Sequence, residues 1–345
     1  MRRTLSFLAV GIALGVPPAG AQDPDIRVVI RDAVKTAAPR AYQGRTRNNG
    51  PEETEKFSRK VKVGRDGRVS ISNIAGDIKV AGGSGDEVVI DAVKRTRGGQ
   101  GQLAAVHITV DDRPGRVEVR TEYDSDRSFR NRNIDVSVDY TVLVPATATV
   151  DVKSISGSVT VTGVQGVVHA ETVSGTLASS STPKLAAKTV SGDIELISAP
   201  ADADLAATTI SGSIRAKGLR IRTLDLGSVS GDVALTDIAC DRLGVKSVSG
   251  SVEFVGSLGK SGRYEINSHS GSVRLSLSGN TGFELNANSF SGSIRSDFPV
   301  TLGPTSSRTD RGRRGPEHAT HAVFGDGSAT LNLRTFSGDI ILTKR

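Results

Sequence analysis

The residue types that most often do chemistry are few and scattered in this chain of 345 residues. Nucleophilic catalysis needs a serine or cysteine beside a base, and a Gly-x-Ser-x-Gly elbow would place such a serine between a strand and a helix. No such elbow occurs in that context, and the five histidines lie in unrelated surroundings, at His107, His169, His269, His318 and His321. The sequence therefore predicts no catalytic residues of this class.

Metal binding has two candidate patterns, and both are incomplete. His318-x-x-His321 would place two imidazoles together on a helical turn, but zinc needs further ligands and no cysteine is near. The run from Gly82 to Asp86 matches part of a calcium-binding nonapeptide roll, which requires tandem copies with an aspartate in each. We expect no metal site and no cofactor.

Polysaccharide cleavage is the enzyme class to weigh, because parallel β-helices host such enzymes. Their sites need converging carboxylates and aromatic side chains that contact sugars. Trp is absent, Tyr occurs only four times, and the aspartates that follow recurrent glycines, such as Asp193 and Asp232, alternate with Ser and Thr. A solvated turn explains these aspartates better, so we expect a protein that is not an enzyme.

One short phrase, Ser/Thr-apolar-Ser-Gly-Asp/Ser/Thr-apolar, recurs through the C-terminal two-thirds of the chain. It is clearest at 189–194, 228–233 and 247–252, and a weaker copy surrounds Gly76. Variants lie around Gly157, Gly175, Gly212, Gly271, Gly292 and Gly338. From Gly157 to Gly292 the glycines are about 17 to 21 residues apart, which is a period typical of stacked single-turn repeats.

Each copy of the phrase is flanked by alternating apolar residues, as at Leu185 and Ala187 before it and Ile194 and Leu196 after it. Such alternation predicts two short strands, each with one buried face. Glycine supplies the corner between them because it tolerates positive φ, and the neighbouring polar side chains can bond to the turn. Two short strands cannot bury a face alone, so the repeats must stack. We therefore predict an all-β, single-domain β-solenoid with coils of about 20 residues, spaced by about 4.8 Å.

The first 60 residues predict two segments without repeats. Residues 1–21 have a basic start, an apolar run and a small-residue end, which is the composition of a cleavable secretory signal peptide. Residues 22–60 carry Pro, Gly, Asn and scattered charges, and we interpret them as a flexible basic leader that includes a short helix near 26–34. No second apolar run is long enough to span a membrane.

The remainder divides into a cap and regular coils. Residues 61–150 have loosely spaced strand patterns, and we expect an irregular β capping region there. Residues 151–345 hold the regular repeats, interrupted by a basic loop at about 303–321 that we interpret as a loop extruded from a coil. Loops on rigid scaffolds often carry function, so the candidate partner-binding residues are Arg308, Arg311, Arg313 and Arg314.

Charge and cysteine content limit the partners. The formal charge of +7 becomes 7 − 2 = +5 once Arg2 and Arg3 leave with the signal peptide, which is mild for this length. The basic residues do not interleave with aromatic ones, so we expect no nucleic-acid binding. Cys240 is the only cysteine, so the chain has no internal disulfide, and we expect this side chain to face the core.

Together these features resemble a bacterial family. They are the array of Val-Ser-Gly-Asp-like corners, the Val144-Pro145 joint, the weak copy at Gly76, and the Gly325-Asp326-Gly327 turn before the last copy at 335–340. The resemblance is to the β-strand-repeat domain of unknown function labelled “putative adhesin”, over roughly residues 61–345. It implies a β-solenoid with an adhesin-like surface role, and it carries no catalytic residues.

We therefore expect a secreted, non-enzymatic β-solenoid, located in the periplasm or at the cell surface. The favoured function is an adhesin-like or envelope-associated module that binds an unidentified macromolecule of the cell envelope. The alternative is a structural envelope protein that self-assembles through the ends of its solenoid, because the chain stops at Arg345, directly after its last repeat. A polysaccharide-acting enzyme is the third and least favoured function.

Overall fold

The structure is a computed structural model that describes residues 51–124, 135–299, 301–302 and 318–345. The chain forms two units, Met1–Asn48 and Asn49–Arg345, and every described residue belongs to the second. The expected signal peptide and most of the expected leader, including its short helix, therefore lie outside the described residues. They stay predictions.

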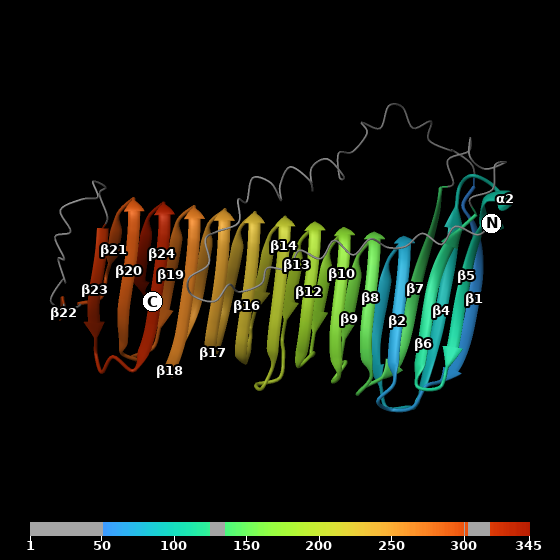
Figure 1. Cartoon of the computed structure of the whole chain (residues 1–345), viewed down its shortest axis with the longest axis horizontal. Helices are drawn as coiled ribbons and strands as arrows, with labels where there is room; N and C mark the ends of the chain where they lie inside the picture. The colour runs from blue at the N-terminus through green and yellow to red at the C-terminus, as the bar shows by residue number, and fades with distance from the viewer. Residues whose placement is uncertain (1–50, 125–134, 300, 303–317) are drawn as a thin grey trace, which may run out of the picture. The chain divides into compact units, whose positions relative to one another are not determined.

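The second unit is built from strands, and the described residues include a single short helix, α2 (Gln100–Leu103). The strands pair in two rows (Figure 1). The first row has the spatial order β5 (Val106–Arg113), β6 (Arg116–Tyr123), β2 (Arg68–Ala75), β8 (Thr149–Ser156), β10 (Val167–Ser174), β12 (Lys184–Ser191), β14 (Asp204–Ser211), β16 (Arg220–Ser230), β17 (Val233–Ser249), β18 (Val252–Ser270), β24 (Ala329–Ser337), β20 (Phe283–Ser291), β23 (His318–Phe324) and β22 (Thr301–Leu302).

The second row lies on the other side of the corners. Its spatial order is β1 (Glu53–Lys62), β4 (Glu87–Thr96), β7 (Val136–Pro145), β3 (Ile78–Gly83), β9 (Val159–Thr162), β11 (Leu177–Ser180), β13 (Ile194–Ile197), β15 (Ile214–Lys217), the first parts of β17 and β18, β19 (Val273–Ser278), β25 (Ile340–Lys344) and β21 (Ile294–Ser296). Strands β17 and β18 are long because each continues from the second row of one coil into the first row of the next.

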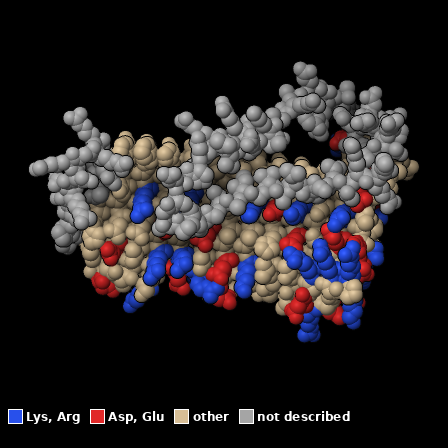
Figure 2. Space-filling model, in the orientation of Figure 1, with Lys and Arg blue, Asp and Glu red and all other residues tan. Residues whose placement is uncertain are grey.

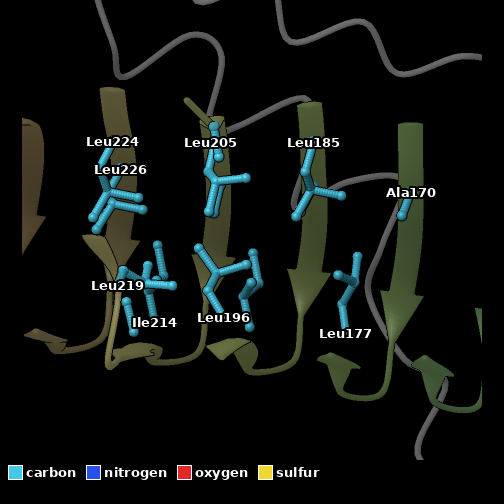
Figure 3. Close-up of a cluster of buried hydrophobic side chains, with 14 of the residues drawn as sticks. Ala170, Leu177, Leu185, Leu196, Leu205, Ile214, Leu219, Leu224 and Leu226 are labelled. Carbon is cyan, nitrogen blue, oxygen red and sulfur yellow. The ribbon is translucent and has the colours of Figure 1, made fainter. Parts of the chain in front are cut away.

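The core is the space between the two rows. In β12, Leu185 and Ala187 are buried, and after the corner Ile194 and Leu196 of β13 are buried in the same way. Equivalent residues of successive coils lie beside one another, as Leu185, Leu205 and Leu224 do in Figure 3. The strands of successive coils pair in parallel. The predicted all-β, solenoid-like fold is therefore confirmed.

The N-terminal strands depart from this pattern. Antiparallel pairs join β1 to β4, β4 to β7 and β5 to β6, while β2 and β3 pair in parallel with the first regular coil. Strand β1 begins at Glu53, inside the segment that the sequence assigned to the leader. The sequence signal is weak there because β1 pairs with one strand only and buries little beyond Val61 and part of Phe57.

The C-terminal coil, formed by β24 and β25, is not the last coil of the stack. Strand β24 pairs with β18 on one side and with β20 on the other, so Leu331 lies between Tyr264 and Leu285. Along the sequence, β20 and β21 come first and β22 and β23 follow. The last two strands, β24 and β25, lie between the coil of β18 and β19 and the coil of β20 and β21 (Figure 1). The described part of the interval before Gly338 contains strands β22 and β23, residues 303–317 of the expected loop lie outside the described residues, and Arg345 does not end the stack. Every copy of the phrase presents the same alternation, so the pattern alone does not fix the order of coils.

We predict that Gly231→Ala lowers the free energy of unfolding by more than the ~1–3 kcal/mol expected for a strained backbone alone. Gly231 has a φ of 144°, and a Cβ there would overlap the carbonyl oxygen of Gly212. Gly227→Ala is the matched control, because its Cβ would meet nothing closer than a side-chain atom of Thr208 at 3.4 Å. Urea unfolding of both variants tests this. Equal midpoints would contradict the role of the corner.

We also predict that deleting residues 329–345 unfolds more than the deleted coil. Because β24 joins β18 to β20, its loss leaves β20 without its parallel neighbour. Hydrogen exchange should show amide protection lost in Phe283–Ser291 and retained in β10 and β12. Protection retained in β20 would show that the inserted coil is dispensable.

Candidate functional site

Among the residues singled out for chemistry, those that the structure describes do not gather into one site. Arg308, Arg311, Arg313 and Arg314 lie outside the described residues, so their role stays a prediction. His318 and His321 belong to strand β23 and not to a helical turn. The helical turn that this pair would need is therefore not formed by the segment.

His321 has a different partner. Its Nε2 lies 2.9 Å from Oε1 of Glu284 on the adjacent strand β20, and both side chains are partly exposed. The hydrogen bond from His321 lowers the pKa of the Glu284 carboxyl below its usual value. Within the described ranges, no three His, Cys, Asp or Glu side chains gather in a group that could hold a metal ion.

Cys240 is buried in the core, as expected from the sequence. Burial raises the pKa of its thiol to about 12, so the thiolate that would act as a nucleophile does not form near neutral pH. Its backbone carbonyl accepts a hydrogen bond from the Tyr264 hydroxyl at 2.6 Å. Cys240 therefore serves the packing of the core.

The corners carry a column of buried hydroxyl groups. The first Ser or Thr of each phrase points into the core, at Ser154, Thr172, Thr189, Thr209, Ser228, Ser247, Ser268, Ser289 and Thr335. Several donate to a corner glycine carbonyl, as Ser228 does to Gly231 at 3.1 Å and Ser289 to Gly338 at 3.1 Å. These bonds satisfy carbonyls at the turn, whereas the hydroxyls of Ser154, Thr189 and Ser268 are buried without a hydrogen-bond partner.

The aspartate after the corner glycine links coils. Asp193 Oδ1 accepts a hydrogen bond from the Ser213 N–H of the next coil at 2.8 Å, and Asp232 accepts one from Ser251 at 2.8 Å. The sequence predicted a solvated, locally bonded turn, whereas the carboxylate reaches across to its neighbour. The Ser213 N–H, and then the Arg215 guanidinium at 2.8 Å, lower the pKa of Asp193.

One more feature repeats from coil to coil: the residue between the two polar residues of the phrase, which is apolar in nine of ten coils. We call this column of residues the corner row. In spatial order it comprises Ile74, Ile155, Val173, Val190, Ile210, Val229, Val248, His269, Phe336 and Phe290. It crosses ten coils, which is about 43 Å at the usual strand spacing, and none of its residues is buried.

Five apolar residues of the corner row are exposed, and the other four are half-buried. Val173 is 45% exposed and Phe336 is 50% exposed. The arrowheads of β8, β10 and β12 in Figure 1 mark the edge where the corners lie, and in Figure 2 the visible part of that edge over the C-terminal coils is largely free of charge. Contiguous exposed apolar surface of this kind marks interaction sites.

Aromatic rings complete the row at its C-terminal end. Phe336 stacks on His269 with ring centroids 5.0 Å apart and on Phe290 with centroids 4.8 Å apart, and both pairs are nearly parallel. Strand pairing fixes these distances, because β18, β24 and β20 are consecutive in space. The rings are therefore held in place before any partner binds.

Sequence reasoning missed the corner row because it assigned the whole phrase to the turn. The signal was present in the alternation: Leu185, Ala187 and Thr189 face the core, so the next residue, Val190, must face outward. An apolar type at an outward position in nine of ten coils is what a binding surface would require.

The described residues contain no helix that is long and apolar enough to cross a membrane.

The model of one protein family, described as Toastrack DUF4097, matches residues 51–217 and 184–343. None of the curated proteins matches the chain.

Three solved structures are similar in chain path. A putative adhesin from Bacteroides fragilis shares 12% identity over 84% of this chain and 97% of its own, with a TM-score of 0.43. A putative adhesin from Parabacteroides distasonis shares 13% over 86% and 98%, with a TM-score of 0.39. A putative lipid binding protein from the same species shares 12% over 66% and 91%, with a TM-score of 0.37.

We predict that Asp193→Asn makes stability less sensitive to acid. The folded pKa of Asp193 is lowered, so its contribution is complete above the unfolded value of about 3.9 and is lost as the pH falls through the folded value. Asparagine keeps the acceptor for Ser213 and removes the titration. Unfolding midpoints from pH 7 downward should therefore fall less steeply in the variant than in the wild type. Parallel curves would contradict this assignment.

Proposed function

The chain belongs to the Toastrack family, DUF4097, and from this premise we propose that it is an exported, non-enzymatic module that binds a macromolecule at the cell envelope through its corner row. The observation that carries the proposal is the exposure of apolar side chains at one position in successive coils, such as Ile155, Val173 and Val248. Exposing them to water is unfavourable, and covering them by a partner would remove that cost.

The backbone makes the row suited to binding. Each of its residues lies two positions before a corner glycine, and successive corners are joined by strand pairing and by the hydrogen bonds that Asp193 and Asp232 accept from the next coil. A surface that is already ordered loses little conformational entropy when it binds. Export is supported by the signal-like composition of residues 1–21.

End-to-end assembly, the alternative, has less support. In the described residues the first row continues beyond β20 into the antiparallel strands β23 and β22, and the other end of that row is the antiparallel strand β5. Such strands break the parallel pattern that a further coil would extend. The part of the chain that the structure describes brings together no cluster of side chains that supports a polysaccharide-acting enzyme. The basic loop with Arg308, Arg311, Arg313 and Arg314 stays a prediction for a second contact.

We predict that Val173→Lys combined with Val248→Lys reduces binding of the mature protein, residues 22–345, to envelope fractions of the producing cell at least tenfold. Both side chains are exposed at the corner, so lysine can reach water without unfolding the coil. Cosedimentation measures the binding.

The matched control is Ile197→Lys, because Ile197 is 51% exposed but lies on β13, outside the corner row. It should bind like the wild type. If the double variant also binds like the wild type, the corner row is not the binding surface.

A further inference from the structure

We propose that the macromolecule bound at the corner row is a second copy of this chain, lying side by side with the first and with its coils stacked in the same direction. This inference rests on the proposed function, since it names the partner of the same surface. It is carried by two columns of charged side chains, of opposite sign, that flank the row.

The first column stands on the first-row strands, one position before the buried Ser or Thr. We call it the leading column. In spatial order it reads Ser72, Lys153, Glu171, Lys188, Thr208, Gly227, Lys246, Asn267, Arg334 and Asn288. Four residues are cations, and the one acid, Glu171, pairs within the chain with Lys153 at 3.3 Å.

The second column follows the corner glycine, on the other side of the row. We call it the trailing column. It reads Asp77, Ser158, Thr176, Asp193, Ser213, Asp232, Ser251, Ser272, Asp339 and Ser293. Four residues are acids and none is a cation, so the apolar row separates a basic side from an acidic side.

Symmetry then selects one orientation. When two corners face each other and the stacks run in the same direction, a two-fold axis along the stack relates them, and the leading column of one copy faces the trailing column of the other. When the stacks run in opposite directions, like columns face each other. Opposite charges therefore meet only in the parallel arrangement, and like charges meet in the antiparallel one.

The charges of the two copies also lie at matching positions along the stack. In the parallel arrangement equivalent coils face each other, so Lys188 lies opposite Asp193, and Arg334 lies opposite Asp339, in both halves of the pair. Lys246 and Lys153 lie one coil, about 4.8 Å, from the levels of Asp232 and Asp77. That step is within the reach of a lysine side chain. All four cations thus have an acid at their own level or at the next one.

The described residues leave much of this charge unpaired within one copy. Lys188, Lys246 and Arg334 make no ion pair there, and neither do Asp232 and Asp339, although both aspartates accept backbone hydrogen bonds. Asp193 also contacts Arg215. Surface pairs of this kind add little affinity but set orientation, so the apolar row would supply the affinity and the two columns the direction.

The same columns disfavour an anionic membrane as the occupant. Anionic lipid attracts a surface flanked by cations on every side, whereas here four aspartates border the row. A second copy satisfies both columns at once. It is also present wherever the chain is exported.

The first test is the concentration dependence of mass for residues 22–345, by sedimentation equilibrium. We expect a dimer, and we expect Lys188→Glu combined with Lys246→Glu to raise its dissociation constant at least tenfold by placing like charges opposite the aspartates. Lys217→Glu is the control, since Lys217 is exposed on β15 and lies outside both columns. It should leave the dissociation constant unchanged.

The second test is orientation. In the parallel pair each residue of the row faces its own copy, so Val173→Cys should form a disulfide with itself on mild oxidation, and Val248→Cys should do the same. In an antiparallel pair at most one of the two residues can lie at the level of the two-fold axis and face its own copy, so the two disulfides cannot both form. The native Cys240 thiol does not compete because it is buried, with a pKa of about 12.

The outcomes separate this inference from the proposed function. A protein that stays monomeric, yet binds envelope through the corner row, would overturn the second copy as partner and leave the proposed function intact. If the monomer binds vesicles of anionic phospholipid, and Val173→Lys combined with Val248→Lys removes that binding, the partner of the corner row is a membrane and not a second copy. A dimer that survives Val173→Lys combined with Val248→Lys, or that forms neither self-disulfide, would overturn the proposed surface or its orientation. A wild-type protein that forms no dimer, and whose envelope binding is unaffected by Val173→Lys combined with Val248→Lys, would reject both proposals.

Discussion

At each corner a glycine lies directly against the carbonyl oxygen of the corner glycine in the neighbouring coil, so closely that a Cβ would overlap that oxygen. The contact recurs from Gly76 and Gly157 through Gly250 and Gly271 to Gly338 and Gly292. Most of these glycines also have a positive φ, which residues with a side chain rarely adopt. Glycine permits this close contact, and it also permits the positive φ that most of these corners adopt.

This close approach organises the polar groups around it. On the inner side of the turn, several of the buried Ser and Thr hydroxyls donate to glycine carbonyls, as Ser247 does to Gly250 at 3.3 Å. On the outer side, the aspartate carboxylate accepts the N–H of the following coil. Polar residues that look like ordinary turn formers in the sequence therefore hold successive coils in register.

The same geometry produces the exposed row. Strand alternation turns the residue before the second Ser outward, and the corner keeps it at the same place in every coil. Val173, Val190 and Ile210 consequently form one continuous apolar line although they are far apart in the sequence. Charged residues on either side of the corner are brought into separate columns by the same repetition. The stacking of the coils at their corner glycines determines where the row and its flanking columns lie. The residue types at those positions determine their chemistry.

The sequence by itself determined the all-β class, the solenoid-like repeat, the corner glycines and the buried side of each strand, because all of these depend on local φ preferences and on a two-residue period. It also placed Cys240 in the core. It did not predict the start of β1 at Glu53, since an edge strand with one partner buries too few residues to show alternation. The tertiary structure alone decided that the last repeat lies between β18 and β20, because coils that carry the same pattern can pair in any order. It also decided that the apolar corner residues and the opposite charges beside them form continuous columns, since pairing between coils, and not sequence distance, sets which side chains become neighbours.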